Sequence, residues 1–203
     1  MLNMDFTCPC FIDLATQAWQ QSPKPGVTRQ LLERENAESG HTTSIVRYQA
    51  GAHFAPHSHP LGEEIFVLEG TFSDEHGHYP AGSYLRNPPG SQHAPYSENG
   101  CLLFVKLNQF HEYDTQASCS FVHPLSNLRL HHFANQNTDY HYYPCSTLIQ
   151  LNQHATRSEL LLIEGSLQLN GVNYNAPYWV RIPVAVTINI VANQQTRLLI
   201  IQR

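Results

Sequence analysis

The sequence is poor in charged residues. They make up 13% of its 203 residues, about half of the ~25% that is usual in globular proteins. With 41% hydrophobic residues, such a chain can bury a sizeable core, which argues against intrinsic disorder. Lys and Arg together number only 11, the formal net charge is −5 and no basic run is present. Because nucleic-acid binders carry a basic patch, we expect no nucleic acid among the partners.

Long apolar runs are absent as well. No stretch approaches the ~20 apolar residues of a membrane span. The N-terminal segment Met1–Trp19 carries an acid at Asp5 and no basic region, unlike a signal peptide. We therefore expect a cytoplasmic protein with no membrane partner. The five cysteines are odd in number and irregular in spacing, which fits reduced thiols better than a disulfide framework.

Turn-forming residues are plentiful, with 13 Pro and 11 Gly. Between them lie short runs rich in β-branched, aromatic and aliphatic residues, and none shows a sustained helical period. The clearest runs are Thr43–Tyr48, Ile65–Leu68 and Leu102–Leu107. Short strands with frequent turn signals predict an all-β sandwich or barrel.

The second half of the chain repeats the first. The segment from Glu64 reads EIFVLEG and the segment from Glu159 reads ELLLIEG, an offset of 159 − 64 = 95. The same offset carries Arg86 to Arg181 without a gap, which indicates two tandem copies of one β unit. We expect an N-terminal extension over residues 1–30, a metal-binding domain over 31–110 and a degenerate copy over 120–203.

Histidine is the most informative residue type, because the 13 histidines outnumber Lys and Arg together. His57 and His59 are two apart, so in a strand both point to the same face. Glu63 follows after a turn, and His93 comes from a separate hairpin. Three neutral imidazoles and one carboxylate that converge can hold a divalent metal ion and leave coordination positions open. His53 shares the parity of His57 and could face the same cavity, where we expect it to support the site or to be structural rather than to act as a ligand.

These segments resemble the two cupin signatures. The stretch from Gly51 to Gly70 follows G-x5-H-x-H-x3-E-x6-G throughout. The stretch from Gly82 follows G-x5-P-x-G-x2-H-x3-N up to its last position, where Ser97 replaces Asn. Residues 62–95 look very similar to the ChrR-type cupins, which include the C-terminal half of the ChrR anti-sigma factor and are related to 2,4′-dihydroxyacetophenone dioxygenases.

The resemblance implies a fold of tandem jelly-roll (RmlC-like cupin) β-barrels with a metal at the centre of the first. It implies one divalent metal ion per chain, zinc or iron(II), with manganese or nickel as alternatives. The implied ligands are His57, His59, Glu63 and His93. Glu64 is the rival carboxylate, but it leaves five rather than six residues before Gly70 and points to the opposite face of the strand.

The second copy has lost this ligand set. The offset of 95 carries the four ligand positions to Asn152, His154, Ser158 and Ile188. A single imidazole cannot hold a metal ion tightly, so we expect no metal there. A packing role is the simpler interpretation, and a metal-free ligand pocket is the alternative.

Three functions fit a metal-binding double cupin. The first is a ligand- or stress-sensing regulatory protein of the ChrR type, although the H-x3-C-x2-C motif of the sigma-binding zinc module does not occur in this sequence. The second is an Fe(II)-dependent dioxygenase that cleaves C–C bonds of small hydroxy-ketones or diketones, and the third is a metal-storage module. We expect a small-molecule ligand or substrate, and a homodimer is compatible with the sequence.

Overall fold

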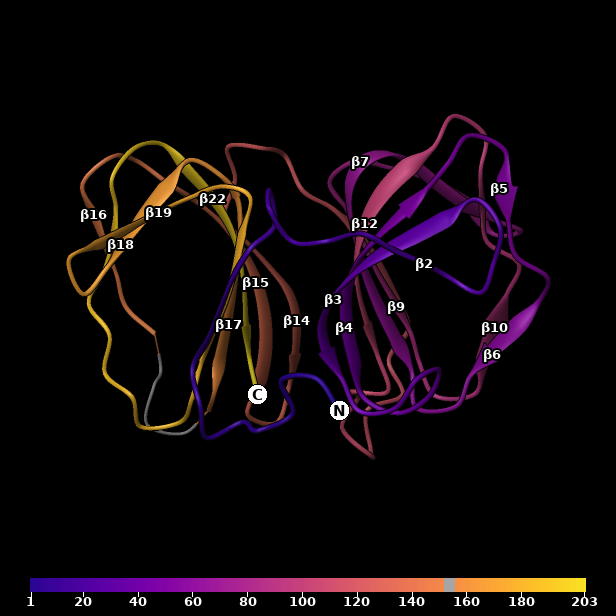
Figure 1. Cartoon of the computed structure of the whole chain (residues 1–203), viewed down its shortest axis with the longest axis horizontal. Helices are drawn as coiled ribbons and strands as arrows, with labels where there is room; N and C mark the ends of the chain where they lie inside the picture. The colour runs from indigo at the N-terminus through magenta and orange to yellow at the C-terminus, as the bar shows by residue number, and fades with distance from the viewer. Residues whose placement is uncertain (152–155) are drawn as a thin grey trace. The chain divides into compact units, whose positions relative to one another are not determined.

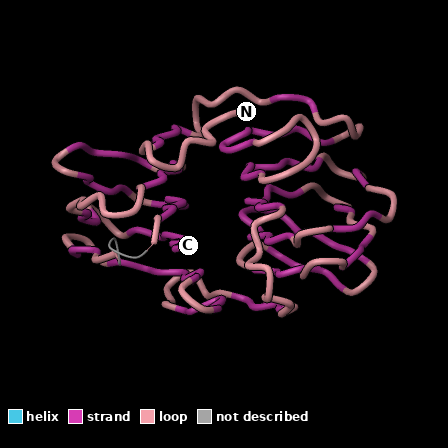
Figure 2. Tube along the Cα trace, turned by 90° about the horizontal axis from the view of Figure 1, so that it is seen from below, coloured by secondary structure: helices cyan, strands magenta, loops and turns pink. Residues whose placement is uncertain are grey.

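The computed structural model describes residues 1–151 and 156–203, and the regular structure in these ranges consists of β-strands alone (Figure 2). This confirms the all-β prediction. The described ranges contain no helix with the length and apolarity that a membrane crossing requires. The chain divides into two compact units. The first consists of Met1–Met4 and Ala18–Phe121, and the second of Asp5–Gln17 and Val122–Arg203.

The first unit is built around the antiparallel sheet β13-β9-β7-β12-β4-β3-β2 (Figure 1, indigo to pink). Strand β7 continues beyond this path, where it pairs with β8 and β11, and β6 and β10 form a separate two-stranded sheet. The strands are β2 (Gln20–Gln21), β3 (Val27–Arg34), β4 (Thr42–Tyr48), β5 (Ala52–His53), β6 (His57–His59), β7 (Glu63–Asp74), β8 (Gly77–Pro80), β9 (Ser83–Asn87), β10 (Ser91–His93), β11 (Tyr96–Ser97), β12 (Cys101–Leu107) and β13 (Ser118–Phe121).

The second unit contains the sheets β1-β20-β17-β22-β15-β14 and β16-β21-β18-β19. Its strands are β1 (Cys10–Asp13), β14 (Leu128–Phe133), β15 (Gln136–Tyr143), β16 (Thr147–Ile149), β17 (Ser158–Glu164), β18 (Ser166–Leu169), β19 (Val172–Asn175), β20 (Tyr178–Ile182), β21 (Ile190–Ala192) and β22 (Thr196–Gln202).

The internal repeat is visible in the strands themselves. The order β9-β7-β12-β4-β3 of the first unit recurs as β20-β17-β22-β15-β14 in the second. Adding 95 to the bounds of β8, β9 and β12 gives the bounds of β19, β20 and β22 without error. Strands β6 and β10 differ, because residues 186–188, which correspond to β10, form no strand.

Residues 1–30 do not stand apart from the two units. Strand β1 pairs with β20 of the second unit from Cys10 to Asp13, whereas β2 and the start of β3 belong to the first unit. The residues expected to form an N-terminal extension are therefore divided between the two units. The polar loop at residues 22–26 is a hairpin turn between β2 and β3.

Each unit buries an apolar core between its sheets. In the second unit the core joins Leu160 and Leu162 of β17 to Leu167 of β18 and Ile190 of β21, so the two sheets pack face to face. In the first unit Ile65 and other residues of the main sheet enclose a comparable core. The hydrogen-bonded sheets remain open in the described residues, which fits the expected jelly rolls, because a jelly roll consists of two packed sheets.

Strand β7 changes direction at Gly70, which has a φ of 71°. A side chain there would collide with the carbonyl oxygen of Gly100, and an L-residue rarely adopts this φ. The pairing with β12 shifts register beside this point, between Leu102 and Leu103. The bend lets one continuous strand contribute Glu63 near its start and Asp74 at its end to the same region of the unit.

Candidate metal centre

Two short strands bring the three predicted histidines together. Strands β6 and β10, which are both labelled in Figure 1, pair antiparallel. In this pairing His93 lies directly opposite His57. His59 follows two residues after His57 on the same face, as alternation requires. Their ligand nitrogens all lie within 4.8 Å of one another, a spacing that lets one ion reach all three.

Glu63 completes this group from the start of β7. Its Oε2 lies 3.4 Å from Nε2 of His59 and 3.4 Å from Nε2 of His93. The Asn87 side-chain amide donates a hydrogen bond of 2.9 Å to the same oxygen and so fixes the carboxylate. Glu63 therefore lies beside two of the three clustered histidines.

Glu64 lies on the opposite face of β7. The Tyr84 hydroxyl donates a hydrogen bond of 2.6 Å to Glu64, and the Arg86 guanidinium pairs with the same carboxylate oxygen. Arg86 also donates to Asp114 over 2.6 Å. Because Glu64 is committed to this buried ion network, the geometry favours Glu63 as the carboxylate of the histidine site.

Hydrogen bonds orient two of the three imidazoles. Nδ1 of His57 lies 3.1 Å from the Ala55 carbonyl oxygen, and Nδ1 of His93 lies 3.2 Å from Asp74 Oδ2. When Nδ1–H donates to an oxygen, Nε2 carries the lone pair. This tautomer presents Nε2 of each ring to its neighbours in the group.

The donor set fits a metal ion. Nε2 of His59 and Nε2 of His93 are buried without a hydrogen-bond partner, although buried polar atoms are nearly always paired. Their contacts with Glu63 are longer than ordinary hydrogen bonds. Burial also lowers the pKa of His59, against the opposing pull of Glu63, which favours the neutral imidazole that a metal requires. A divalent ion would satisfy both orphaned nitrogens at once.

Asp74 contacts the candidate site through His93, and the sequence did not reveal this contact. Besides facing His93, its carboxylate accepts hydrogen bonds from the backbone N–H of His76 (2.8 Å), from that of Gly77 (3.2 Å) and from the Tyr79 hydroxyl (3.2 Å). A carboxylate behind a metal-binding imidazole fixes the ring and raises its basicity. The available signal was an acid three residues before the turn-forming residue Gly77. This signal does not specify a partner 19 residues away.

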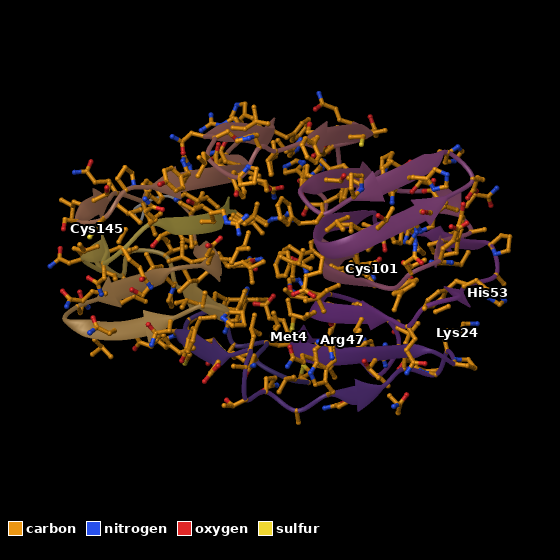
Figure 3. All side chains as sticks on the ribbon, turned by 90° about the horizontal axis from the view of Figure 1, so that it is seen from above. Met4, Lys24, Arg47, His53, Cys101 and Cys145 are labelled. Atoms are coloured by element: carbon orange, nitrogen blue, oxygen red, sulfur yellow. The ribbon has the colours of Figure 1, made fainter. Side chains whose placement is uncertain are left out.

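The expectation that His53 could face the same cavity as His57 is wrong. Its side chain is exposed, it contacts the Gly51 carbonyl oxygen at 3.3 Å, and it does not line the cavity beside the histidines. Figure 3 shows the labelled His53 at the surface of the first unit. Strands β5 and β6 are separate elements, so the alternation of faces is interrupted between His53 and His57.

A cavity of about 440 Å³ opens onto the histidines. This volume falls within the range of small-molecule pockets. Its walls also include the apolar residues Val27, Val46, Phe72, Leu103 and Val105. A ligand with a polar head and an apolar body would match this mixed lining.

The corresponding region of the second unit is different. Ser158 is buried and accepts a hydrogen bond of 3.1 Å from the Gln202 side chain, and Ile188 packs against the apolar core. Asn152 and His154 lie outside the described residues. An alkyl side chain and a serine hydroxyl are poor ligands for a transition metal, and the absence of a metal in this copy stays a prediction.

Comparison with known proteins relates the first unit to a family. The model of the ChrR cupin-like domain family matches residues 8–111, which includes all four residues of the site. No curated protein matches the chain.

Solved structures share the fold over nearly the whole chain. A bacterial pirin, YhhW of Escherichia coli in complex with nickel(II), is 14% identical, with a TM-score of 0.77 over 96% of this chain and 98% of that one. A candidate dioxygenase from Nostoc punctiforme is 14% identical, with a TM-score of 0.75 over 97% and 83%. A salicylate 1,2-dioxygenase variant from Pseudoaminobacter salicylatoxidans is 11% identical, with a TM-score of 0.61 over 80% and 71%. At these identities the similarity is one of fold.

Replacement of each of the two neighbouring glutamates by glutamine should separate their roles. Glu63→Gln removes the charged oxygen beside two imidazoles, so we expect metal affinity to fall at least about tenfold. Glu64→Gln should leave metal affinity unchanged but lower the free energy of unfolding by about 1–3 kcal/mol, because it weakens the contact with Arg86. Metal titration and urea denaturation of both variants measure these effects. The opposite ranking of metal affinities would refute the assignment.

Asp74→Asn should weaken metal binding about 10- to 100-fold, because it removes the charged acceptor behind His93. Asp114→Asn is the matched control, since it also removes a buried carboxylate charge but one that faces Arg86. We expect this control to lose stability and to keep its metal affinity. Competition with a chelator of known affinity provides the comparison, and equal affinities for Asp74→Asn and the unaltered protein would contradict the assigned role.

Proposed function

The chain belongs to the ChrR cupin-like domain family, and from that premise we propose that its first unit binds one divalent metal ion. The proposed ligands are His57, His59, Glu63 and His93. The observation that carries this proposal is the pair of buried Nε2 atoms of His59 and His93, which lack hydrogen-bond partners and lie beside the Glu63 carboxylate.

We propose that the bound metal serves to hold a small ligand, so that the protein acts as a sensing or regulatory cupin. A divalent ion supplies a Lewis acid with open coordination positions. The chain contributes the orientation: Ala55 and Asp74 fix two imidazoles, and Asn87 fixes the Glu63 carboxylate. The 440 Å³ cavity provides the space for the ligand beside these groups.

An Fe(II)-dependent dioxygenase is the second candidate, with small hydroxy-ketones or diketones as substrates. The mainly apolar cavity walls favour it, because they would shield a bound substrate from water. Structures of a salicylate 1,2-dioxygenase and of a candidate dioxygenase share the fold. Zinc suits the sensing role and iron(II) the enzymatic one, so the native metal separates the two candidates. Manganese and nickel are further options, and a nickel complex is known for the pirin.

The protein should contain one divalent metal per chain, and His57→Ala together with His93→Ala should abolish binding. Because protonated imidazole does not bind metal, occupancy should fall as the pH drops through roughly 6, near the free histidine pKa of ~6.5. The lowered pKa of His59 keeps that ring neutral to lower pH than a free histidine. Elemental analysis across a pH series tests this, and a double variant that retains one metal per chain would refute the site.

The dioxygenase candidate predicts oxygen consumption. Protein loaded anaerobically with iron(II) should take up one O2 per molecule of a small diketone or hydroxy-ketone that is cleaved, whereas zinc-loaded protein should take up none. His93→Ala with added iron(II) controls for iron in solution. If a panel of such compounds gives no uptake above this control, the enzymatic candidate is rejected.

A further inference from the structure

Tyr48 lines the cavity and is not a ligand of the proposed metal site. It is the last residue of β4 and is only 7% exposed. Its ring packs against Phe54, with centroids 5.3 Å apart, and against Phe72 at 6.1 Å. The preceding residue, Arg47, which is labelled in Figure 3, is exposed and lies over the Trp19 ring. Tyr48 is thus held firmly on the inner face of the sheet.

The Tyr48 hydroxyl has no hydrogen-bond partner among the residues that the structure describes. Other buried tyrosines are paired: the Tyr84 hydroxyl donates to Glu64 over 2.6 Å, and the Tyr140 hydroxyl donates to the Pro124 carbonyl oxygen over 3.1 Å. Tyr48 lines the cavity, so a molecule that enters the cavity can accept a hydrogen bond from this hydroxyl.

The surroundings determine what this hydroxyl can do. Burial raises the pKa of Tyr48 well above its usual value, and the nearby Glu63 charge adds to the effect. The phenol is therefore a hydrogen-bond donor at any physiological pH. Tyr48 also lines the same cavity as Glu63 and the three histidines. A ligand that approaches the histidines would pass an O–H donor on one side.

We propose that Tyr48 donates a hydrogen bond to an oxygen of the small ligand that binds beside the histidines, and that this ligand is an oxygen chelator with an apolar body. The assignment rests on the proposed metal site. The polar head matches the polar lining residues Tyr48, Glu63 and the histidines, and the apolar body matches apolar lining residues such as Val46 and Leu103. Tyr48 then selects ligands that present an acceptor oxygen.

Two probe molecules and one variant test the proposal. Full-length protein loaded with cobalt(II) is titrated with acetohydroxamate, an oxygen chelator, and with imidazole, which offers no acceptor once bound to a metal. Visible absorbance of the cobalt reports binding. Tyr48→Phe should weaken acetohydroxamate binding about tenfold or more, as expected for a lost hydrogen bond to a charged oxygen. Imidazole affinity and cobalt content should stay within about twofold of the unaltered protein.

A stability measurement separates a ligand-binding role from a structural one. Since the hydroxyl is unpaired in the free protein, Tyr48→Phe should melt at the same temperature or higher. Tyr84→Phe is the matched control, because it loses a hydrogen bond to Glu64 on the other face of β7. It should melt at a lower temperature and keep its acetohydroxamate affinity.

The outcomes are distinguishable. Unchanged acetohydroxamate affinity in Tyr48→Phe at full cobalt content would overturn the assignment of Tyr48 and leave the metal site intact. Equal weakening for both probes, or a lower melting temperature of Tyr48→Phe, would identify a structural role and overturn it as well. Failure of the unaltered protein to bind cobalt would overturn the metal site and this inference together.

Discussion

Buried imidazole nitrogens that lack a hydrogen-bond partner are the constraint around which the first unit is organised. His59 and His93 each place Nε2 at one protected point, and Glu63 adds a carboxylate there. Burial of unpaired polar atoms is unfavourable, so the arrangement makes physical sense once an ion coordinates them. The β6–β10 pairing and the bend of β7 at Gly70 are the backbone features that allow this convergence.

Much of the fold and the four central residues could be predicted because they depend on local pattern. Strands follow from β-branched runs between turn residues, and the offset of 95 fixes the counterparts of β8, β9 and β12. The site residues follow from spacing along β6, β7 and β10. Asp74, Asn87 and Tyr48 were out of reach, because their roles depend on register between strands. The same limit explains the error at His53, where a loop interrupts the alternation.

The two units show what a duplicated β unit can keep and lose. The second unit keeps the strand order of the main sheet and its apolar core, since both depend on hydrophobic alternation that many sequences satisfy. Residues 186–188, at the position of β10, form no strand, and Ser158 and Ile188 stand at positions that correspond to two of the proposed ligands. A metal site requires specific donors in a specific geometry, which is a stricter demand than an apolar core makes.

The central claim is that one metal ion lies among His57, His59, Glu63 and His93. Anomalous X-ray diffraction from crystals of nickel-loaded protein, recorded at the nickel absorption edge, tests it most directly. The account predicts one strong peak in the first unit at about 2.0–2.3 Å from its nitrogen and oxygen ligands. A peak located elsewhere, or no peak in crystals that contain the metal in solution, would contradict it.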